Sequence, residues 1–137
     1  MWFSLKVFKL DDVYSKLEIP CGKHADEVII TDDKVFIVER TGRAKLEDIR
    51  KLIETINCIM GNERLQSELL RRSSIKGIAM IVIIHSPRRI DSEVIDKLRC
   101  DVSNLNRSLR GRGVSVRISR RASCYEDLRV IVSHCGS

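Results

Sequence analysis

The stretch Asp26-Glu-Val-Ile-Ile-Thr-Asp-Asp-Lys-Val-Phe-Ile-Val-Glu-Arg-Thr41 predicts a β-hairpin. Two β-branched runs, Val28–Ile30 and Val35–Val38, flank a short polar connection, which is the usual pattern of two strands joined by a tight turn. Asp26 opens the first strand and Glu39 closes the second. In an antiparallel pair the start of one strand lies beside the end of the other. We therefore expect these two carboxylates to meet at one end of the hairpin.

The composition predicts one globular domain spanning residues 1–137. Of the 137 residues, 43% are hydrophobic and 32% are charged, which suits a domain of ordinary size with its own core. The longest apolar run, Ile78–Ile84, has the length of a buried strand and not of a membrane span. The first residues lack the basic segment and long apolar segment of a signal peptide. We expect a cytoplasmic protein without membrane contact.

Strand and helix signals alternate along the rest of the chain and predict an α/β fold with a central mixed sheet flanked by helices. The uninterrupted apolar run 78–84 is typical of a strand covered on both faces. The expected elements are, in order, a strand within 3–10, a helix ending before residue 20, the hairpin, a helix over 46–60, a helix from 63, the buried strand, a helix over 92–109 and a strand over 114–118. The last element is expected to be a strand over 128–132 or a helix from 123 onward.

Local signals predict where the helices begin and which side chains they bury. The expected N-caps are Asp11 or Asp12, Asn62, and Asp91 or Ser92. The residues expected on apolar helix faces are Leu46, Ile49, Ile53, Ile56 and Met60 in one long helix, and Val94, Ile95, Leu98, Val102, Leu105 and Leu109 in the other.

The order of these elements, with Ala25-Asp26 before one strand and Val38-Glu39-Arg40-Thr41-Gly42 at the end of the next, resembles the PD-(D/E)XK nuclease superfamily. Its RecB-like and archaeal Holliday-junction-resolvase branches are the most similar, over roughly residues 11–86. The resemblance implies a restriction-endonuclease-like core. It also implies that Asp26 and Glu39, with the carbonyl of Arg40, bind Mg²⁺ or Mn²⁺, and that the metal polarises a phosphodiester and activates a water.

The resemblance also implies a lysine two residues after Glu39, where this chain has Thr41. Threonine has no positive charge and a shorter reach, and Arg40 points to the opposite face of the strand. Arg43 or Lys45, in the loop and first helical turn that follow, are the candidates for a relocated catalytic cation. The departure affects the expected catalysis and leaves the expected fold unchanged. Asp26 and Glu39 also fit a second interpretation, as solvated residues at strand ends.

The positive charge is concentrated in the second half of the chain. Residues 1–69 carry 11 Lys/Arg against 13 Asp/Glu, whereas residues 70–137 carry 14 against 6. The arginines expected to contact nucleic-acid phosphates are Arg107, Arg110, Arg112, Arg117, Arg120 and Arg121. Aromatic residues make up only 4% of the chain, so backbone contacts to a duplex or junction are favoured over base stacking. A solvated basic surface is the alternative interpretation.

Histidine and cysteine give weaker signals. His24 shares a strand face with Asp26 by alternation and is a candidate accessory ligand. The pairs Cys21/His24 and His134/Cys135 lack the second half of a zinc site. Five cysteines without a C-x-x-C pair indicate no secreted disulfide framework; Cys58 and Cys100 are expected in the core, and a disulfide is an option for a hyperthermophile source.

Three functions remain open on these grounds. The first is a nucleic-acid-binding protein, for DNA or RNA, whose nuclease-like site has lost its lysine and its activity. The second is a protein-interaction or assembly subunit with an incidental α/β fold, bound to a partner protein. The third is a Mg²⁺- or Mn²⁺-dependent endonuclease that uses Lys45 or Arg43. A homodimer is also expected, because the resemblance is to enzymes that act on junctions as dimers.

Overall fold

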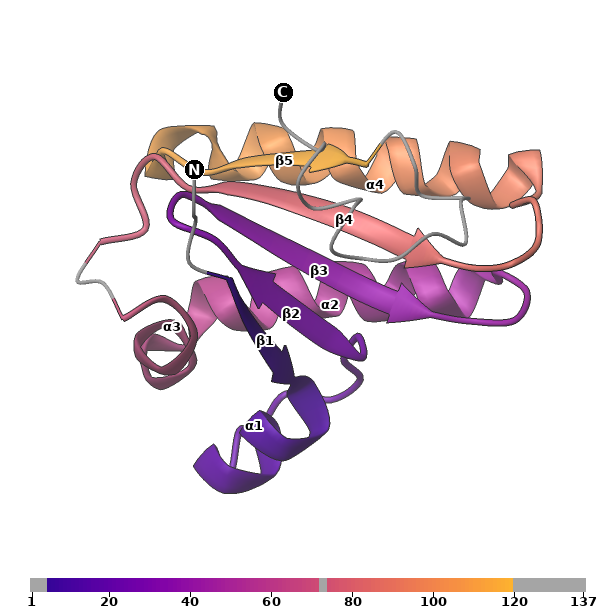
Figure 1. Ribbon diagram of the computed structural model, residues 1–137. Helices are drawn as coiled ribbons and strands as arrows, with labels where there is room; N and C mark the ends of the chain where they lie inside the picture. The colour runs from indigo at the N-terminus through magenta and orange to yellow at the C-terminus, as the bar shows by residue number, and fades with distance from the viewer. Residues whose placement is uncertain (1–4, 72–73, 120–137) are drawn as a thin grey trace.

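The central strand of the fold, β3, is the second strand of the predicted hairpin (Figure 1). The computed structural model describes residues 5–71 and 74–119. Its elements are β1 (Lys6–Lys9), α1 (Leu10–Leu17), β2 (Glu27–Ile30), β3 (Lys34–Arg40), α2 (Leu46–Gly61), α3 (Glu63–Leu70), β4 (Ala79–His85), α4 (Ser92–Leu109), a short 3₁₀ turn η1 (Arg110–Arg112) and β5 (Ser115–Ile118).

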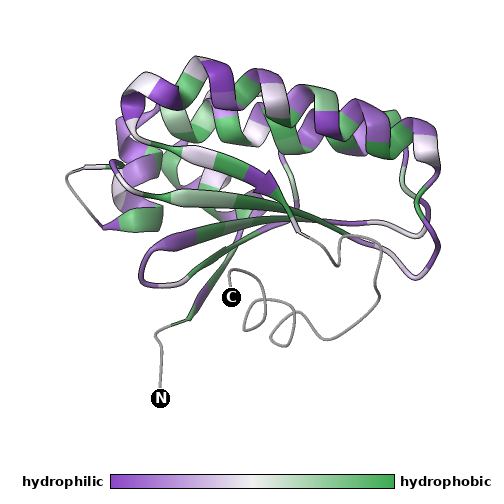
Figure 2. Cartoon of the chain, turned by 90° about the horizontal axis from the view of Figure 1, so that it is seen from above, coloured by the Kyte–Doolittle hydropathy of each residue, from purple (hydrophilic) through white to green (hydrophobic). Residues whose placement is uncertain are grey.

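The described strands form one mixed five-stranded sheet in the order β1-β2-β3-β4-β5. β1, β2 and β3 pair antiparallel, whereas β3, β4 and β5 pair parallel. Parallel neighbours need a crossover, and the helices that provide it here include α2 and α4. These two helices lie on the same face of the sheet (Figure 2). The predicted α/β class, with a mixed sheet flanked by helices, is confirmed.

Side-chain alternation along β3 decides which side chains meet the helices. Val35 and Ile37 belong to the main hydrophobic core, which also contains the buried faces of α2 and α4. Phe36 and Val38 belong to a smaller cluster on the opposite face of the sheet. Since side chains alternate along a strand, Glu39 is placed on the helix side.

The strand β4 is buried on both faces, as the unbroken apolar run predicts. Met80, Val82 and Ile84 pack in the main core, and Ile81 and Ile83 pack in the smaller cluster. At the edge of the sheet, β5 has one wet face, with Val116 buried and Arg117 exposed. The predicted element over 128–132 lies outside the described residues. None of the described helices is long and apolar enough to cross a membrane.

The predicted start of the first helix is wrong by a few residues. α1 follows β1 directly, so Lys9 takes the N-cap position and the fully buried Leu10 begins the helix. Asp11 and Asp12 therefore lie in the first turn, where carboxylates interact favourably with the helix dipole. The cap of α3 is confirmed, because the Asn62 side chain accepts the Leu65 N–H at 2.9 Å. Asp91 occupies the N-cap position of α4 without a side-chain capping bond.

Several predictions about buried helix residues need correction. Leu46 is 47% exposed, because it is the first residue of α2 and lies beyond the edge of the core. Cys100 is exposed, since the buried stripe of α4 runs through other positions. Cys58 is buried as predicted and forms a disulfide with Cys21, which supports the disulfide alternative. The other predicted inward residues are buried except Ile53 and Ile95, which are half-buried.

Candidate metal and phosphate site

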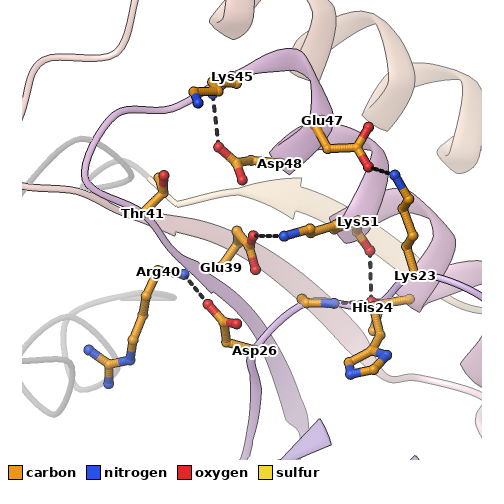
Figure 3. Close-up of polar contacts among 12 residues, drawn as sticks. Lys23, His24, Asp26, Glu39, Arg40, Thr41, Lys45, Glu47, Asp48 and Lys51 are labelled. Carbon is orange, nitrogen blue, oxygen red and sulfur yellow. Dashed lines mark hydrogen bonds and ion pairs between the residues drawn. The ribbon is translucent and has the colours of Figure 1, made fainter. Parts of the chain in front are cut away.

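Asp26 and Glu39 come together at the end of the hairpin, as expected. Glu27 pairs with Val38, so the residues just beyond that pair lie opposite one another. The Asp26 N–H donates to the Val38 carbonyl at 3.1 Å, and the Asp26 carboxylate accepts the Arg40 N–H at 2.8 Å (Figure 3). Asp26 is exposed, so one carboxylate of the pair faces solvent at this edge of the sheet.

Glu39 is the buried member of the pair. It is 1% exposed and lies under α2. Its Oε2 contacts the Nζ of Lys51 at 3.2 Å. Its Oε1 is buried and has no hydrogen-bond partner within the described residues. A buried carboxylate oxygen without a partner is unusual in a folded protein, and here it adjoins an exposed carboxylate.

The surroundings of Glu39 favour its neutral form. Its pKa is raised to about 8, chiefly because the carboxyl is buried; the charge of Asp26 and the neighbouring Asp48 carboxyl act in the same direction, and Lys51 opposes them. In return, Glu39 raises the pKa of the Lys51 ammonium. The carboxyl is therefore mostly protonated at neutral pH in the absence of a cation. A divalent ion would compete with that proton for the same oxygens.

Lys51 provides the ammonium group that the hairpin lacks. It lies in the second turn of α2, three residues after the buried Asp48, and its side chain is 35% exposed. Figure 3 shows it reaching from the helix to the Glu39 carboxylate. An ammonium group thus lies between the buried carboxylate and solvent, although it comes from a helix and not from the strand.

One face of α2 holds the segment that leads into β2. Thr55 Oγ1 accepts the Ala25 N–H at 2.7 Å and donates to the Lys51 carbonyl at 2.7 Å. One turn further on, the Cys58–Cys21 disulfide joins the same segment to the same helix. These positions are spaced like successive turns of one helix face. The helix that carries the lysine therefore also fixes the segment that carries Asp26.

Neither residue proposed to replace the missing lysine is found in contact with Glu39 in the described part of the chain. Arg43 pairs with Asp91 at 3.6 Å, and the backbone N–H of Lys45 donates to the Asp48 carboxylate at 2.9 Å at the start of α2. Thr41 Oγ1 donates to the Arg43 carbonyl at 3.0 Å. The cation beside Glu39 is Lys51, which was not among the predicted site residues.

Arg40 lies on the opposite face of the sheet, as expected from alternation. Its guanidinium contacts the Glu27 carboxylate and lies 3.1 Å from the Nδ1 of His85. It therefore cannot take the place of a cation beside Glu39.

A sequence signal for Lys51 was present. Asp48, Lys51 and Thr55 are polar residues at helical spacing, and they flank the apolar stripe of the predicted helix. Two of them, Asp48 and Thr55, are buried. Polar residues spaced by three and four positions lie on one side of a helix. Here Lys51 contacts Glu39, whereas Thr55 accepts the Ala25 N–H.

The structure does not bring His24 to the carboxylate pair. Its Nε2 lies 2.5 Å from Oδ1 of Asp11, and its ring packs against Tyr14 with centroids 4.4 Å apart. Cys21, the other half of the weak zinc signal, is in a disulfide with Cys58 and is not free to bind metal. His134 and Cys135 lie outside the described residues.

Arg107, Arg110 and Arg112, from the predicted basic cluster, lie at the opposite end of the strands from the carboxylates. The strand β4 ends beside the carboxylates, α4 returns along the sheet, and β5 begins opposite the first residue of β4 (Figure 1). Arg107 contacts Asn104, and Arg112 donates to the Met60 carbonyl at 3.1 Å. Arg110 lies in η1, and Arg117 lies in β5, opposite Ile81 of β4. Arg120 and Arg121 lie outside the described residues.

The donors at the hairpin end fit a hard divalent cation with an incomplete protein ligand set. Asp26 offers an exposed carboxylate, and Glu39 offers an oxygen without a partner. Among the described residues no three His, Cys, Asp or Glu side chains form a complete metal-binding group. Mg²⁺ is commonly held by one or two carboxylates and otherwise by water and phosphate oxygens. The pair therefore suits Mg²⁺ or Mn²⁺ and does not suit zinc.

Comparisons with protein-family models, with curated proteins and with solved structures found no match to this chain.

Proposed function

We propose that this chain is a Mg²⁺- or Mn²⁺-dependent nuclease with a PD-(D/E)XK-like site, in which Lys51 replaces the lysine expected at Thr41. The observation that carries the proposal is the contact of 3.2 Å between Lys51 Nζ and Glu39 Oε2. The missing lysine was the reason to favour an inactive nucleic-acid binder. An ammonium group in contact with the buried carboxylate removes that reason.

The residues of the chain divide the work as follows. Asp26 and Glu39 would hold the cation, which when bound acts as a Lewis acid on a phosphodiester oxygen. Lys51, with its side chain 35% exposed, offers positive charge where the phosphate gains negative charge during attack by water. Water forms the new bond to phosphorus as the ester P–O bond breaks, and the leaving oxygen takes up a proton. The expected cytoplasmic location is a separate proposal.

Two substitutions and a matched control test this proposal. Asp26→Asn and Lys51→Met are expected to reduce cleavage of single-stranded, duplex or branched DNA or RNA by about 100-fold or more, the usual cost of one group that stabilises transition-state charge. Lys97→Met is the control, because Lys97 forms an exposed pair with Asp101 on α4. Absence of metal-dependent cleavage of every substrate, or cleavage that both site variants retain, would refute the nuclease.

The second candidate is the inactive nucleic-acid binder of the sequence analysis. It is favoured by one observation, the pKa of about 8 for Glu39, because a protonated carboxyl is a poor metal ligand. This candidate predicts binding that falls with salt and no cleavage at any pH between 6 and 9. Cleavage that increases with pH over that range distinguishes the nuclease from the binder. The expected homodimer is a separate proposal, tested by the molar mass in solution.

A further inference from the structure

The loops after β3 and β4 leave the sheet side by side, at the end of the strands where Asp26 and Glu39 lie (Figure 1). Arg40 pairs with His85 at the ends of these parallel strands. The Thr41 N–H donates to the His85 carbonyl at 3.1 Å, and Ser86 Oγ donates to the Gly42 carbonyl at 3.2 Å. Carboxyl ends of parallel strands are a common place for ligand-binding loops. The loop 86–91 is therefore next to the candidate metal site.

This loop carries two exposed arginines between two buried residues that hold it in place. Ser86 is fully buried, Ile90 is 5% exposed, and the Arg88 N–H donates to Ser86 Oγ at 3.2 Å. Between these anchors Pro87, Arg88 and Arg89 are exposed. Neither guanidinium has an ion-pair partner in the parts of the chain that the structure describes. Exposed arginines without partners on an anchored loop are available to a ligand.

A third arginine faces the same loop from its neighbour. Arg43 lies 3.6 Å from Asp91, and both side chains are more than 60% exposed. A solvent-exposed pair of this length contributes little to stability, so Arg43 can exchange its partner at little cost. The three arginines outnumber Asp91, the acidic residue at the end of the loop, so the two loops after β3 and β4 together carry excess positive charge.

We propose that Arg88 and Arg89, assisted by Arg43, bind a backbone phosphate of the nucleic acid next to the one at the carboxylates; this inference rests on the proposed function. A guanidinium matches a phosphate with two parallel hydrogen bonds. Arg107, Arg110 and Arg112 lie at the opposite end of the strands from this loop, so they cannot contact the same phosphate. The loop therefore binds the nucleic-acid strand next to the phosphate that is cleaved.

The chemistry favours phosphates over bases. The aromatic side chains of the described residues are Phe8, Tyr14 and Phe36, which are half-buried or buried. No stacking platform is therefore exposed beside the loop in the described part of the chain. Phosphate contacts fix the position of a strand without reading its sequence. Binding through this loop is thus expected to be independent of base sequence.

The test measures how nucleic-acid binding depends on salt. Binding of a mixed-sequence DNA duplex, and of its single strand, is followed by fluorescence anisotropy in EDTA so that no cleavage occurs. The double variant Arg88→Ala/Arg89→Ala is expected to bind roughly 10- to 100-fold more weakly at 0.1 M salt, with a slope of log K against log salt smaller by about 2. Arg64→Ala/Arg99→Ala, which removes two exposed arginines of α3 and α4, is the matched control and should keep the wild-type slope.

Further variants separate the outcomes. Arg88→Lys/Arg89→Lys should recover most of the salt slope, since it keeps the charge, but less of the affinity, since lysine lacks the paired donors. If the alanine variant keeps the wild-type slope while cleavage still depends on Asp26 and Lys51, the loop inference is wrong and the nuclease stands. If Arg107→Ala/Arg110→Ala reduces the slope and the loop pair does not, the end of α4 and η1 bind the strand, and the loop inference is wrong. If the wild type neither binds nor cleaves, both proposals fail.

Discussion

Replacing Glu39 by glutamine should change the pH dependence of stability in one direction only. Its pKa of about 8 in the folded chain compares with 4.5 for the ordinary carboxyl, so the folded state binds the proton more tightly than the unfolded state. The free energy of unfolding is then highest at low pH. It falls as pH rises from about 4.5 to about 8 and is constant above that. Glutamine resembles the protonated carboxyl and does not titrate, so the variant lacks this loss.

The magnitude follows from the same two values. Each pH unit between them changes the free energy of unfolding by about 1.4 kcal/mol for one proton. Between pH 5 and pH 9 the wild type should lose about 3 to 4 kcal/mol relative to Glu39→Gln. The cause is the burial of Glu39, which is 1% exposed and has one oxygen without a partner. The Lys51 contact offsets part of the cost and is included in the shifted pKa.

Urea unfolding of both proteins at intervals from pH 5 to pH 9, with EDTA present to exclude metal binding, measures this difference. The difference between wild type and variant cancels the titration of other groups, because those are common to both. Equal slopes with urea concentration would show that the variant unfolds from a similar native state. A difference that does not change with pH, or that favours the wild type as pH rises, would mean that Glu39 is ionised in the folded chain.

Three other substitutions or conditions test the surroundings of the site. Cys58→Ser should lower the free energy of unfolding by about 4 kcal/mol under oxidising conditions, as expected for a disulfide across a separation of 37 residues, and by little under reducing conditions; Cys100→Ser, which removes an exposed free thiol, is the control. Thr55→Val should cost about 1 to 3 kcal/mol in urea unfolding, because the Ala25 N–H loses its acceptor, whereas Thr55→Ser should keep most of the stability. Binding of Mn²⁺, followed by calorimetry, should tighten up to tenfold per pH unit below about 8 and level off above it, because Glu39 must lose its proton; pH-independent binding would place the metal elsewhere.

The sheet and most of the helices could be predicted because their signals are local. Strand alternation, the unbroken apolar run of β4 and the Asn62 cap depend on neighbouring residues, and each is found where it was expected. The errors arose where tertiary context decides. Leu46 fits the helix period but lies outside the core. The helix α1 begins at Leu10 because β1 passes straight into it, which no capping residue indicates.

The site was half predictable for the same reason. Asp26 and Glu39 are brought together by hairpin geometry, which sequence spacing determines. Lys51 reaches Glu39 only because α2 crosses back over β3. The polar residues beside the apolar stripe of this helix show which of its sides is polar, but they do not identify Glu39 as the group below it. The cations that follow Glu39 most closely in the sequence, Arg43 and Lys45, lie in the loop and first helical turn after the strand. The position of the basic cluster relative to the carboxylates could not be predicted either, since charge density in the sequence does not say at which end of the strands the charges will lie.

The arrangement around Glu39 also explains how one carboxyl can interact with a lysine and a metal together. Lys51 contacts Oε2, whereas Oε1 has no partner in the described residues. Asp26 and Glu39 could therefore hold a cation while Lys51 keeps its contact with Oε2. The cation would replace the proton that burial favours, and the lysine would then face an ionised carboxylate. A buried oxygen without a hydrogen-bond partner lowers the stability of the metal-free chain. A metal bound to this oxygen would explain why the sequence keeps a carboxylate at this position.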